Sequence, residues 1–313
     1  MNTSICITVL NEEYSISKLL DSLLVQSKKS SEIIIVDGGS IDKTVEIIKH
    51  YQKKYSLIKL VVNKSTRAEA RNIAVDFAKS EIVAMTDAGC ITDLDWLKNI
   101  TTPFETGKVD VVAGFYTMTG KTKLQKAMSV YMGVTPKRFN QKFLPSTRSI
   151  AFTKKIWEEV GGFPEKAEGT AEDTLFNLKL VQNKAKISRM KNATVEWGMP
   201  ETISDFYLKI KNYAKGDAKS NNWIFPGKGI MSHNIKAISI FLRYILAFVF
   251  IVICLFNTSL FVYWIMGLFI YLFWAFRKVY LEFSDWKLAL YSPVLQIVSD
   301  FAVMRGFLSG IIG

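Results

Sequence analysis

Two long hydrophobic runs near the end of the chain constrain its fold most strongly. The first, ISIFLRYILAFVFIVICLF, covers residues 238–256, and the second, LFVYWIMGLFIYLFWAF, covers residues 260–276. Helices of this length cross most of a hydrocarbon layer that is about 30 Å thick. These two runs lack a polar face, whereas helices buried in a soluble core usually have one. The sequence therefore predicts a membrane region at residues 226–313 with two to three hydrophobic helices.

Basic residues flank both ends of the predicted hairpin. Six lysines precede the first run: Lys209, Lys211, Lys215, Lys219, Lys228 and Lys236. Asp217 is the one acid in the same stretch. Arg277 and Lys278 follow the second run. Positive flanks mark the cytosolic ends of membrane helices. The opening stretch MNTSICITVLNEE has neither the basic start nor the long apolar run of a signal peptide. We therefore expect an integral membrane protein whose residues 1–225 lie on the cytosolic face.

A third apolar segment, LALYSPVLQIVSDFAVMRGFLSGIIG, closes the chain at residues 288–313. It contains Asp300 and Arg305, and charged side chains are costly in hydrocarbon. A third crossing and a re-entrant or interfacial helix both remain open for this segment.

Charge and rare residues narrow the classes of function. The net charge of +12 is expected to attract the protein to an anionic membrane surface. A nucleic-acid partner is not expected, because the sequence has no nucleic-acid-binding motif. The cysteines Cys6, Cys90 and Cys254 lie far apart, and there are only two histidines. This excludes a disulfide framework, a zinc site and a histidine-based triad. Any metal would be a hard ion on carboxylate and phosphate oxygens.

Strand and helix patterns alternate through the first part of the chain. Short β-branched runs occur at residues 4–10, 32–37, 58–63 and 81–87, and amphipathic segments of about three turns lie between them. This order predicts a mainly parallel sheet covered by helices on both faces. In such sheets the ligand binds outside the carboxyl ends of the strands.

Acids stand where two of these strands end. LNEE follows the first strand and DGGSIDKT follows the second, so neither the G-x-G-x-x-G nor the P-loop pattern is present. An oxidoreductase fused to a membrane anchor is therefore disfavoured. A carboxylate at Asp37 suits the N–H of a base or a sugar hydroxyl. The alternative is a turn aspartate, with Ser40 capping the next helix.

Six motifs together carry a family resemblance. LNEE, VDGGSIDKT, AEARNIAV, TDAGC, VGGFPE and AEDTLF occur in the order and spacing of the family 2 glycosyltransferases. The chain resembles these inverting enzymes of the GT-A fold over residues 1 to about 220, and its tail resembles their membrane-bound members. The resemblance implies an α/β fold, with a Rossmann-like GT-A domain at residues 1–225 before the membrane helices.

The resemblance also implies a donor site for a nucleoside-diphosphate sugar. Thr8 and Glu12 fall in the first nucleotide loop, and Asp37 matches the aspartate that reads the base. Arg71 matches the basic residue near the nucleotide, where its guanidinium suits oxyanions. Without the family, Arg71 would be interpreted as a helix-surface arginine paired with a glutamate.

TDAGC stands at the D-x-D position of the family. Asp87 matches the first aspartate, whereas Gly89 replaces the second. The resemblance implies Mg²⁺ or Mn²⁺ bound by Asp87 and the donor diphosphate, since Mg²⁺ commonly takes one or two protein carboxylates. Asp93 and Asp95 are interpreted as the start of the next helix, outside the site.

The acceptor side is assigned to three residues. Asp173 matches the family's general base, one of which is sufficient for inverting transfer, and Glu172 stands beside it. Arg148 lies in the segment that matches the strand and helix framing the acceptor pocket in the family. The stretch around it is basic and contains no acids, so it could also bind an anionic lipid. The alternative for Asp173 is a helix-capping box with Thr170.

The resulting prediction is an inverting glycosyltransferase. It would move one sugar to a hydroxyl or phosphate acceptor at the membrane, either lipid-linked or on a surface glycan. The Q-x-x-R-W signature of processive synthases is missing. A polyprenyl-phosphate sugar synthase and a catalytically inactive membrane scaffold of the same fold are the alternatives. The sugar, the base and the acceptor are not encoded in motif spacing.

Overall fold

The computed structural model describes residues 1–165, 171–220 and 233–312. The chain forms two compact units. The first comprises Met1–Thr117, Phe139–Ala167 and Glu172–Gly198, and the second comprises Met118–Arg138, Glu168–Ala171 and Met199–Gly313. The predicted boundary between residues 225 and 226 lies outside the described residues, and that division into domains stays a prediction.

The first unit is built on a mixed sheet, with the order β3-β2-β1-β4-β7-β6-β8-β5 in the described part of the chain. The strands are β1 (Thr3–Val9), β2 (Glu32–Asp37), β3 (Ile58–Val62), β4 (Ile82–Met85), β5 (Cys90–Thr92), β6 (Val111–Thr119), β7 (Ile150–Thr153) and β8 (Ile187–Gly198). Strands β3, β2, β1 and β4 run parallel. Strand β7 pairs antiparallel with β4 and β6, and β5 pairs antiparallel with β8. The predicted alternation of strands and helices thus builds the parallel half of the sheet.

The parallel strands end together at one edge. Every residue of β2 is buried, because helices cover both faces and a parallel strand then becomes a continuous apolar run. Val9 at the end of β1 lies opposite Asp37 at the end of β2. The loops that follow these strands therefore share the carboxyl edge of the sheet.

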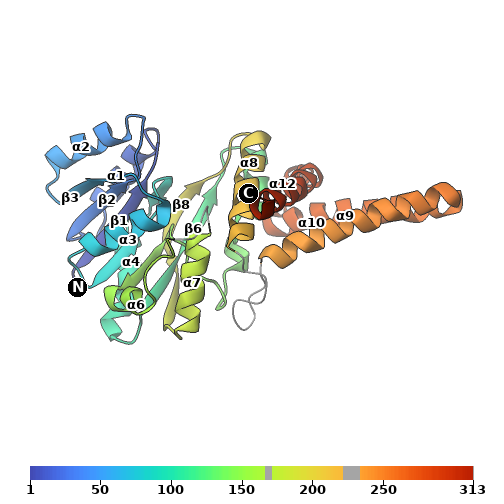
Figure 1. Cartoon of the computed structure of the whole chain (residues 1–313). Coiled ribbons are helices and arrows are strands. Elements are labelled where there is room, and N and C mark those ends of the chain that lie inside the picture. The colour runs from blue at the N-terminus through green and yellow to red at the C-terminus, as the bar shows by residue number, and fades with distance from the viewer. Residues whose placement is uncertain (166–170, 221–232, 313) are drawn as a thin grey trace. The chain divides into compact units, whose positions relative to one another are not determined.

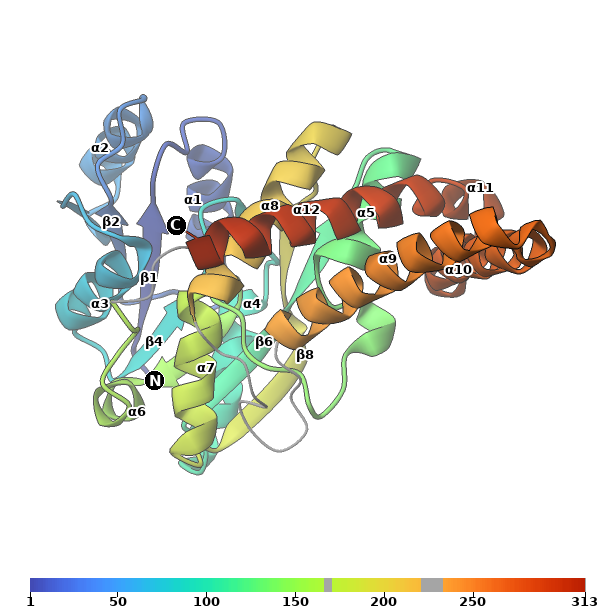
Figure 2. The same ribbon diagram turned by 45° about the vertical axis from the view of Figure 1, so that its right-hand side comes forward.

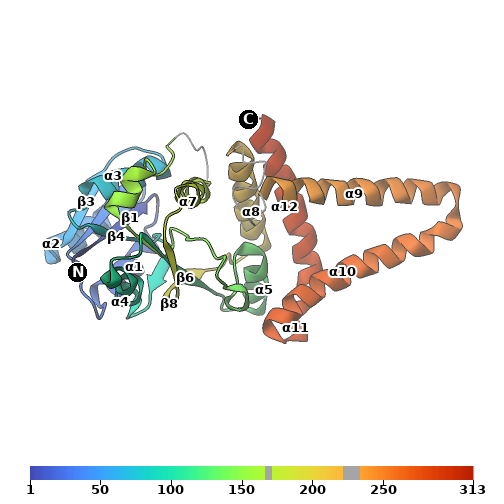
Figure 3. The same cartoon turned by 90° about the horizontal axis from the view of Figure 1, so that it is seen from below.

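Helices cover both faces of this sheet. They are α1 (Ile16–Leu24), α2 (Thr44–Lys54), α3 (Arg67–Phe77), α4 (Trp96–Thr101), α6 (Lys154–Glu159) and α7 (Glu172–Gln182), with a 3₁₀ turn η1 (Thr102–Thr106). Figure 3 shows α3 and α7 on one face and α1 and α4 on the other. A capping box between Thr66 and Glu69 begins α3. The core beneath α3 and α7 includes Phe152, Phe163 and Phe176.

The second unit is helical. It contains α5 (Lys123–Met132), η2 (Pro136–Arg138), α8 (Ile203–Lys219), α9 (His233–Phe256), η3 (Thr258–Leu260), α10 (Phe261–Phe283), α11 (Trp286–Ala289) and α12 (Ser292–Ile312). Helices α9 and α10 form a hairpin that turns at Asn257 (Figure 1). Both extend beyond the predicted runs at their other ends, because backbone hydrogen bonding continues into charged residues such as Arg277.

Three segments of the described chain are long and apolar enough to cross a membrane, judged by length and composition: His233–Phe256, Thr258–Phe283 and Trp286–Ile312. They differ in burial. Only 6% of the apolar window of each hairpin segment is buried, against 39% in the third segment. The hairpin therefore offers its apolar surface outward, whereas the third segment packs partly on protein.

Candidate active site

The loops after β1 and β2 are joined by hydrogen bonds. The Asn11 N–H donates to Ser40 Oγ at 2.8 Å, and the Ile41 N–H donates back to Asn11 Oδ1 at 2.9 Å. The Glu12 N–H donates to Thr44 Oγ1 at 2.7 Å. Asn11 has a φ of 56°, a left-handed conformation that asparagine tolerates better than most residues. The two loops therefore form one platform, and Asn11 and Thr44 are structural residues that the motifs did not single out.

Asp37 ends β2 at this platform and is fully buried. Its Oδ1 accepts the Gly39 and Ser40 N–H groups at 3.0 and 2.9 Å. Its Oδ2 is buried and has no hydrogen-bond partner among the described residues. Oδ1 therefore acts as the hydrogen-bond acceptor of a turn, as the alternative interpretation predicted. Oδ2 can still accept a hydrogen bond from another group. Ser40 does not cap α2, which begins later, at Thr44.

Thr8 and Glu12 lie beside Asp37 on the β1 side. Thr8 pairs in register with Val36, next to Asp37, and both Thr8 and Glu12 are half-buried. The Glu12 carboxylate accepts a hydrogen bond from the Ser15 hydroxyl. The structure therefore places both residues at the carboxyl edge, and their contact with a donor stays a prediction.

Arg71 forms a buried bridge between two elements. Its Nη1 lies 2.5 Å from Glu172 Oε1, and its Nη2 lies 3.1 Å from Asp87 Oδ1 and 2.9 Å from Thr147 Oγ1. Burial alone would lower the pKa of the guanidinium, but the neighbouring carboxylates outweigh burial and raise it. Arg71 is predicted to pair with oxyanions of the donor. Its guanidinium already contacts the carboxylates of Glu172 and Asp87, so the donor would have to bind it beside them.

Glu172 lies in the protein interior, with 2% of its side chain exposed. The Arg67 Nη1 also approaches its Oε1, at 3.5 Å, whereas its Oε2 is buried without a hydrogen-bond partner in the described chain. Glu172 therefore fixes Arg71 from the start of α7. Its predicted role on the acceptor side stays a prediction, since no acceptor contact is tested.

Asp87 follows β4, and one third of its side chain is exposed. Burial would raise the pKa of this carboxyl, but Arg71, Arg148 and Arg67 hold it below its usual range. Asp87 is therefore ionised at neutral pH. A Cβ atom at Gly89 would meet no atom within 4 Å, so there is space where the family has its second aspartate.

The metal prediction rests on a single carboxylate. Among the described residues, no group of three His, Cys, Asp or Glu side chains is arranged to hold a metal. Arg71 takes Oδ1 of Asp87, which leaves Oδ2 for another ligand. Mg²⁺ and Mn²⁺ fit such a site when phosphate oxygens and water complete the coordination.

The next two acids are engaged in contacts between elements. Asp95 Oδ1 accepts from Ser27 Oγ at 2.6 Å, and Asp93 accepts from the Thr194 hydroxyl. Helix α4 begins at Trp96, and Asp95 at its N-cap position makes no side-chain cap bond. Both acids therefore hold α4 and its neighbours together.

Asp173 stands in the first turn of α7. Its Oδ1 accepts the Thr174 N–H at 2.7 Å, and its Oδ2 takes no hydrogen bond within the described chain. Burial raises the pKa of this carboxyl, and the negative charge of Glu172 raises it further, against the opposing charges of Arg71 and Arg148. A raised pKa suits a general base. Thr170, the predicted capping partner, lies outside the described residues.

Arg148 precedes β7 and is held by aromatic rings. Its guanidinium lies 3.8 Å from the centroid of the Trp197 ring and 5.4 Å from that of Tyr116. Its positive charge acts on both Asp87 and Asp173 and lowers the pKa of each. The two rings come from β8 and β6, so no local sequence signal could have revealed this support.

The first unit thus gathers five of the predicted site residues around one centre: Arg71, Asp87, Arg148, Glu172 and Asp173. Thr8 and Asp37 lie at the ends of β1 and β2, and Glu12 lies in the loop after β1, at the same edge of the sheet. With this geometry the site has a carboxylate for a cation, a carboxylate suited to take a proton, and arginines between them.

Comparison with known proteins identifies the family. A family model described as Glycosyl transferase family 2 matches residues 4–162, just over half of the chain. The chain belongs to glycosyl transferase family 2. A second model, Glycosyl transferase family group 2, matches residues 100–277. The predicted family is thereby confirmed.

Curated relatives of this family align over part of their own length. Glycosyltransferase AglE of Haloferax volcanii is 27% identical over 169 residues, which cover 51% of this chain and 55% of the relative. Poly(ribitol-phosphate) β-N-acetylglucosaminyltransferase TarS of Staphylococcus aureus is 28% identical over 224 residues, which cover 68% of this chain and 39% of TarS. The chain therefore spans about half, or less, of the length of these relatives.

Solved structures of similar proteins establish the fold. Residues 1–349 of Staphylococcus aureus TarS in complex with UDP-GlcNAc align with a TM-score of 0.56 at 19% identity, over 99% of this chain and 91% of that one. The mannosyltransferase PcManGT of Pyrobaculum calidifontis, in complex with GDP-Man and Mn²⁺, aligns with a TM-score of 0.54 at 21% identity, over 70% and 64%. The predicted GT-A fold is confirmed.

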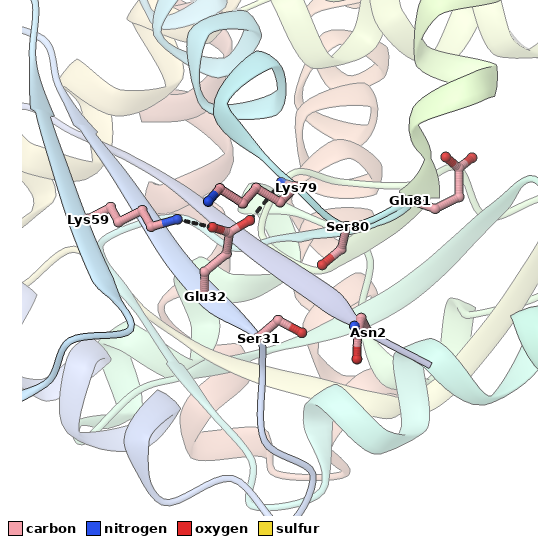
Figure 4. Close-up of a pocket in the computed structure, with 7 residues that line it drawn as sticks. All are labelled: Asn2, Ser31, Glu32, Lys59, Lys79, Ser80 and Glu81. Carbon is pink, nitrogen blue, oxygen red and sulfur yellow. Dashed lines mark hydrogen bonds and ion pairs between the residues drawn. The ribbon is translucent and has the colours of Figure 1, made fainter.

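A separate cavity of about 480 Å³ lies at the amino edge of the same sheet (Figure 4). Seven residues line it: Asn2, Ser31, Glu32, Lys59, Lys79, Ser80 and Glu81. Glu32 begins β2, whereas Asp37 ends it, so this cavity and the candidate site lie at opposite ends of the strand. Burial would raise the pKa of Glu32, but hydrogen bonds from Lys59, the Lys79 N–H and Ser4 lower it. The Glu32 carboxylate therefore has its partners within the fold.

Proposed function

We propose that this chain is an inverting glycosyltransferase that moves one sugar from a nucleoside-diphosphate sugar to an acceptor at a membrane. One observation carries the proposal: Arg71 joins Asp87 to the start of α7, where Asp173 stands. The carboxylate suited to the donor and the carboxylate suited to the acceptor therefore flank one buried guanidinium.

The donor is assigned to the carboxyl edge of β1 and β2. Asp37 Oδ2, a buried acceptor without a partner in the described chain, would accept an N–H of the nucleobase, since an unpaired buried oxygen is costly. Thr8 and Glu12 would line the same loop platform. The similar structures solved with UDP-GlcNAc and GDP-Man support a nucleotide-sugar donor.

Asp87 would hold Mg²⁺ or Mn²⁺ together with the diphosphate of the donor. A bound divalent ion supplies positive charge that stabilises the leaving diphosphate. Arg71 keeps Asp87 ionised and fixes the direction of its carboxylate. The similar mannosyltransferase solved with Mn²⁺ supports this assignment.

Asp173 would act as the general base. Its carboxylate takes the proton of the acceptor hydroxyl while the hydroxyl oxygen attacks the anomeric carbon. The bond from that carbon to the donor diphosphate breaks on the opposite face, so the configuration inverts. The proton ends on Asp173, and the diphosphate carries away the bonding electron pair. Arg148 would stabilise the ionised base and face the acceptor.

The membrane hairpin supports a lipid-linked acceptor or a surface glycan. A relative from Methanococcus voltae is named dolichyl N-acetyl-α-D-glucosaminyl phosphate 3-β-D-2,3-diacetamido-2,3-dideoxy-β-D-glucuronosyltransferase. It is 37% identical over 101 residues, which cover 31% of this chain and 32% of the relative. A polyprenyl-phosphate sugar synthase remains the second candidate. Its phosphate acceptor is already ionised, so it would not require Asp173 as a base.

A donor screen followed by a transfer assay tests the proposal. The full chain in lipid nanodiscs is heated with UDP-, GDP- and dTDP-sugars, each with and without Mg²⁺ or Mn²⁺. A true donor should raise the melting temperature, because it binds the folded state alone. It should do so only when the ion is present, because the proposed site holds the donor diphosphate through that ion. Radiolabelled sugar should then enter the lipid-extractable fraction. A chain that binds no donor and transfers no sugar would be a scaffold, contrary to the proposal.

A further inference from the structure

Helix α12 packs against α8, and the two helices lie side by side in Figure 3 and cross in Figure 2. A Cβ at Gly306 would lie 2.2 Å from the Lys211 carbonyl oxygen, and one at Gly310 would lie 2.6 Å from the Lys215 carbonyl oxygen. The same positions meet the Cβ atoms of Ala214 and Ala218. A G-x-x-x-G pair on α12 thus fits an A-x-x-x-A pair on α8, the small-residue packing that lets helices approach closely.

Helix α8 is too charged to enter hydrocarbon. Its 17 residues include Asp205, Lys209, Lys211, Lys215, Asp217 and Lys219. Charged side chains are costly at the centre of a bilayer. Because α12 packs along α8, an α12 that crossed the bilayer would draw these charges into it.

Both legs of the hairpin meet the middle of α12. Asp300 is 1% exposed and accepts hydrogen bonds from Arg243 Nη2 of α9 at 2.9 Å and from the Tyr271 hydroxyl of α10. Gln296 Nε2 also donates to Asp300, at 2.9 Å. In Figure 3, α12 runs across the open end of the hairpin and does not extend beside it as a third leg.

We propose that α12 is an interfacial helix that lies in the plane of the membrane surface, and that the chain crosses the membrane only twice. The partner of its outer face is the boundary between lipid headgroups and acyl chains. That face is exposed and mostly apolar, with Arg305 as its one charged residue. Its apolar residues recur at helical spacing: Val294, Ile297, Phe301, Leu308 and Ile311. The end of the chain would then lie on the same side of the membrane as α8.

Depth measurement with spin labels tests this inference, and it does not depend on glycosyl transfer. In a variant without the native cysteines, single cysteines replace Val294, Phe301 or Leu308, which are spaced seven residues apart on the exposed face. The labelled chains are reconstituted in bilayers, and collisions with oxygen and with a polar relaxant report depth. The three labels should lie at equal depth near the headgroups.

A matched set on α9 calibrates the measurement. Leu242, Val249 and Phe256 have the same spacing and are exposed. On this spanning helix the three labels should lie at clearly different depths, because each step of seven residues rises about 10.5 Å along the helix axis. If the three α12 labels also differed clearly in depth, with the Phe301 label deepest, α12 would be a third crossing. Labels on α12 that lie wholly in water would also overturn the proposed lipid contact.

The side on which the chain ends provides a second test. A cysteine at Ile312, which is 83% exposed, should react with an impermeant maleimide only after intact cells are permeabilised. A cysteine at Thr258 in the hairpin turn should react in intact cells. Labelling of the Ile312→Cys variant in intact cells would overturn two crossings.

The packing itself has a matched pair of variants. Gly306→Leu should lower the melting temperature by several degrees, because its side chain would overlap the α8 backbone. Gly267→Leu on α10 should leave it nearly unchanged, since no atom lies within 4 Å of that position. Equal melting temperatures for the two variants would contradict the close contact of α8 with α12.

Discussion

Arg71 and Glu172 form a buried ion pair in which Nη1 lies 2.5 Å from Oε1, although 101 residues separate them in sequence. The same guanidinium contacts Asp87, so it links the end of β4 to the beginning of α7. Breaking a buried pair by removing one partner costs about 3 to 5 kcal/mol. The arrangement therefore fixes the distance between the two carboxylates that we assign to chemistry.

Glu172→Gln should shift the pH dependence of the reaction. The charge of Glu172 raises the pKa of Asp173, so its removal should lower that pKa. The base is active when ionised, and the acid limb of kcat/KM should therefore move to lower pH. The matched control is Glu158→Gln, at an exposed position on α6, which should leave the profile in place. An acid limb that stays put or moves to higher pH in Glu172→Gln would contradict the coupling.

Asp87→Asn should remove the dependence on metal while the fold persists. Arg71 keeps its bonds to Glu172 and Thr147 in this variant, so the bridge remains. Turnover should be lost, and Mg²⁺ or Mn²⁺ should no longer strengthen donor binding in a thermal-shift titration. Metal dependence equal to that of the unchanged chain would show that the ion is held elsewhere.

Gly89→Asp should strengthen metal binding. The position has open space for a side chain, and a second carboxylate would add a hard ligand beside Asp87. The metal concentration that gives half-maximal turnover should fall several-fold. Gly89→Asn has the same size without the charge and serves as the control. Equal metal titrations for the two variants would argue against an ion at Asp87.

The orientation of the hairpin can be read from cysteine labelling. Thr258→Cys, at the turn between α9 and α10, should react with an impermeant reagent in intact cells. Gln52→Cys, on the exposed side of α2, should react only after permeabilisation. The reverse pattern would place the candidate site outside the cell and refute the predicted orientation.

The sequence predicted the parallel strands and the hairpin because both depend on local patterns. The run Ile33–Val36 is β-branched and buried, and the runs of α9 and α10 are almost entirely apolar, with Arg243 as their one charged residue. The capping residues of α3 likewise lie within three positions of one another. Local patterns of this kind are readable without knowing what packs against them.

The partners of the site residues could not be predicted in the same way. Glu172 meets Arg71, and Arg148 meets Trp197, only after strands and helices distant in sequence come together. The family motifs predicted a set of site residues, five of which lie together in the first unit, but not that Arg71 already contacts two carboxylates of the chain. The proposal that α12 is interfacial likewise depends on α8, because the G-x-x-x-G pair of α12 packs against Ala214 and Ala218, which are distant in sequence.

The raised pKa of Asp173 gives an expectation for stability as well as activity. The folded chain binds the Asp173 proton more tightly than the unfolded chain, so this group lowers stability as pH rises through the interval between the two pKa values. Above that interval the cost is complete. Asp173→Asn removes it, and the melting temperature at neutral pH should therefore be equal to or higher than that of the unchanged chain.

Turnover of Asp173→Asn at saturating donor and acceptor tests the central claim most directly. The variant keeps the shape of the side chain but cannot accept the proton. We expect turnover to fall by roughly 10² to 10⁴, the usual contribution of a positioned general base, while donor binding and the melting temperature are maintained. Saturating substrates separate this loss from weaker acceptor binding. Turnover above about a tenth of that of the unchanged chain would contradict the account and move the base elsewhere, with Glu172 as the next candidate.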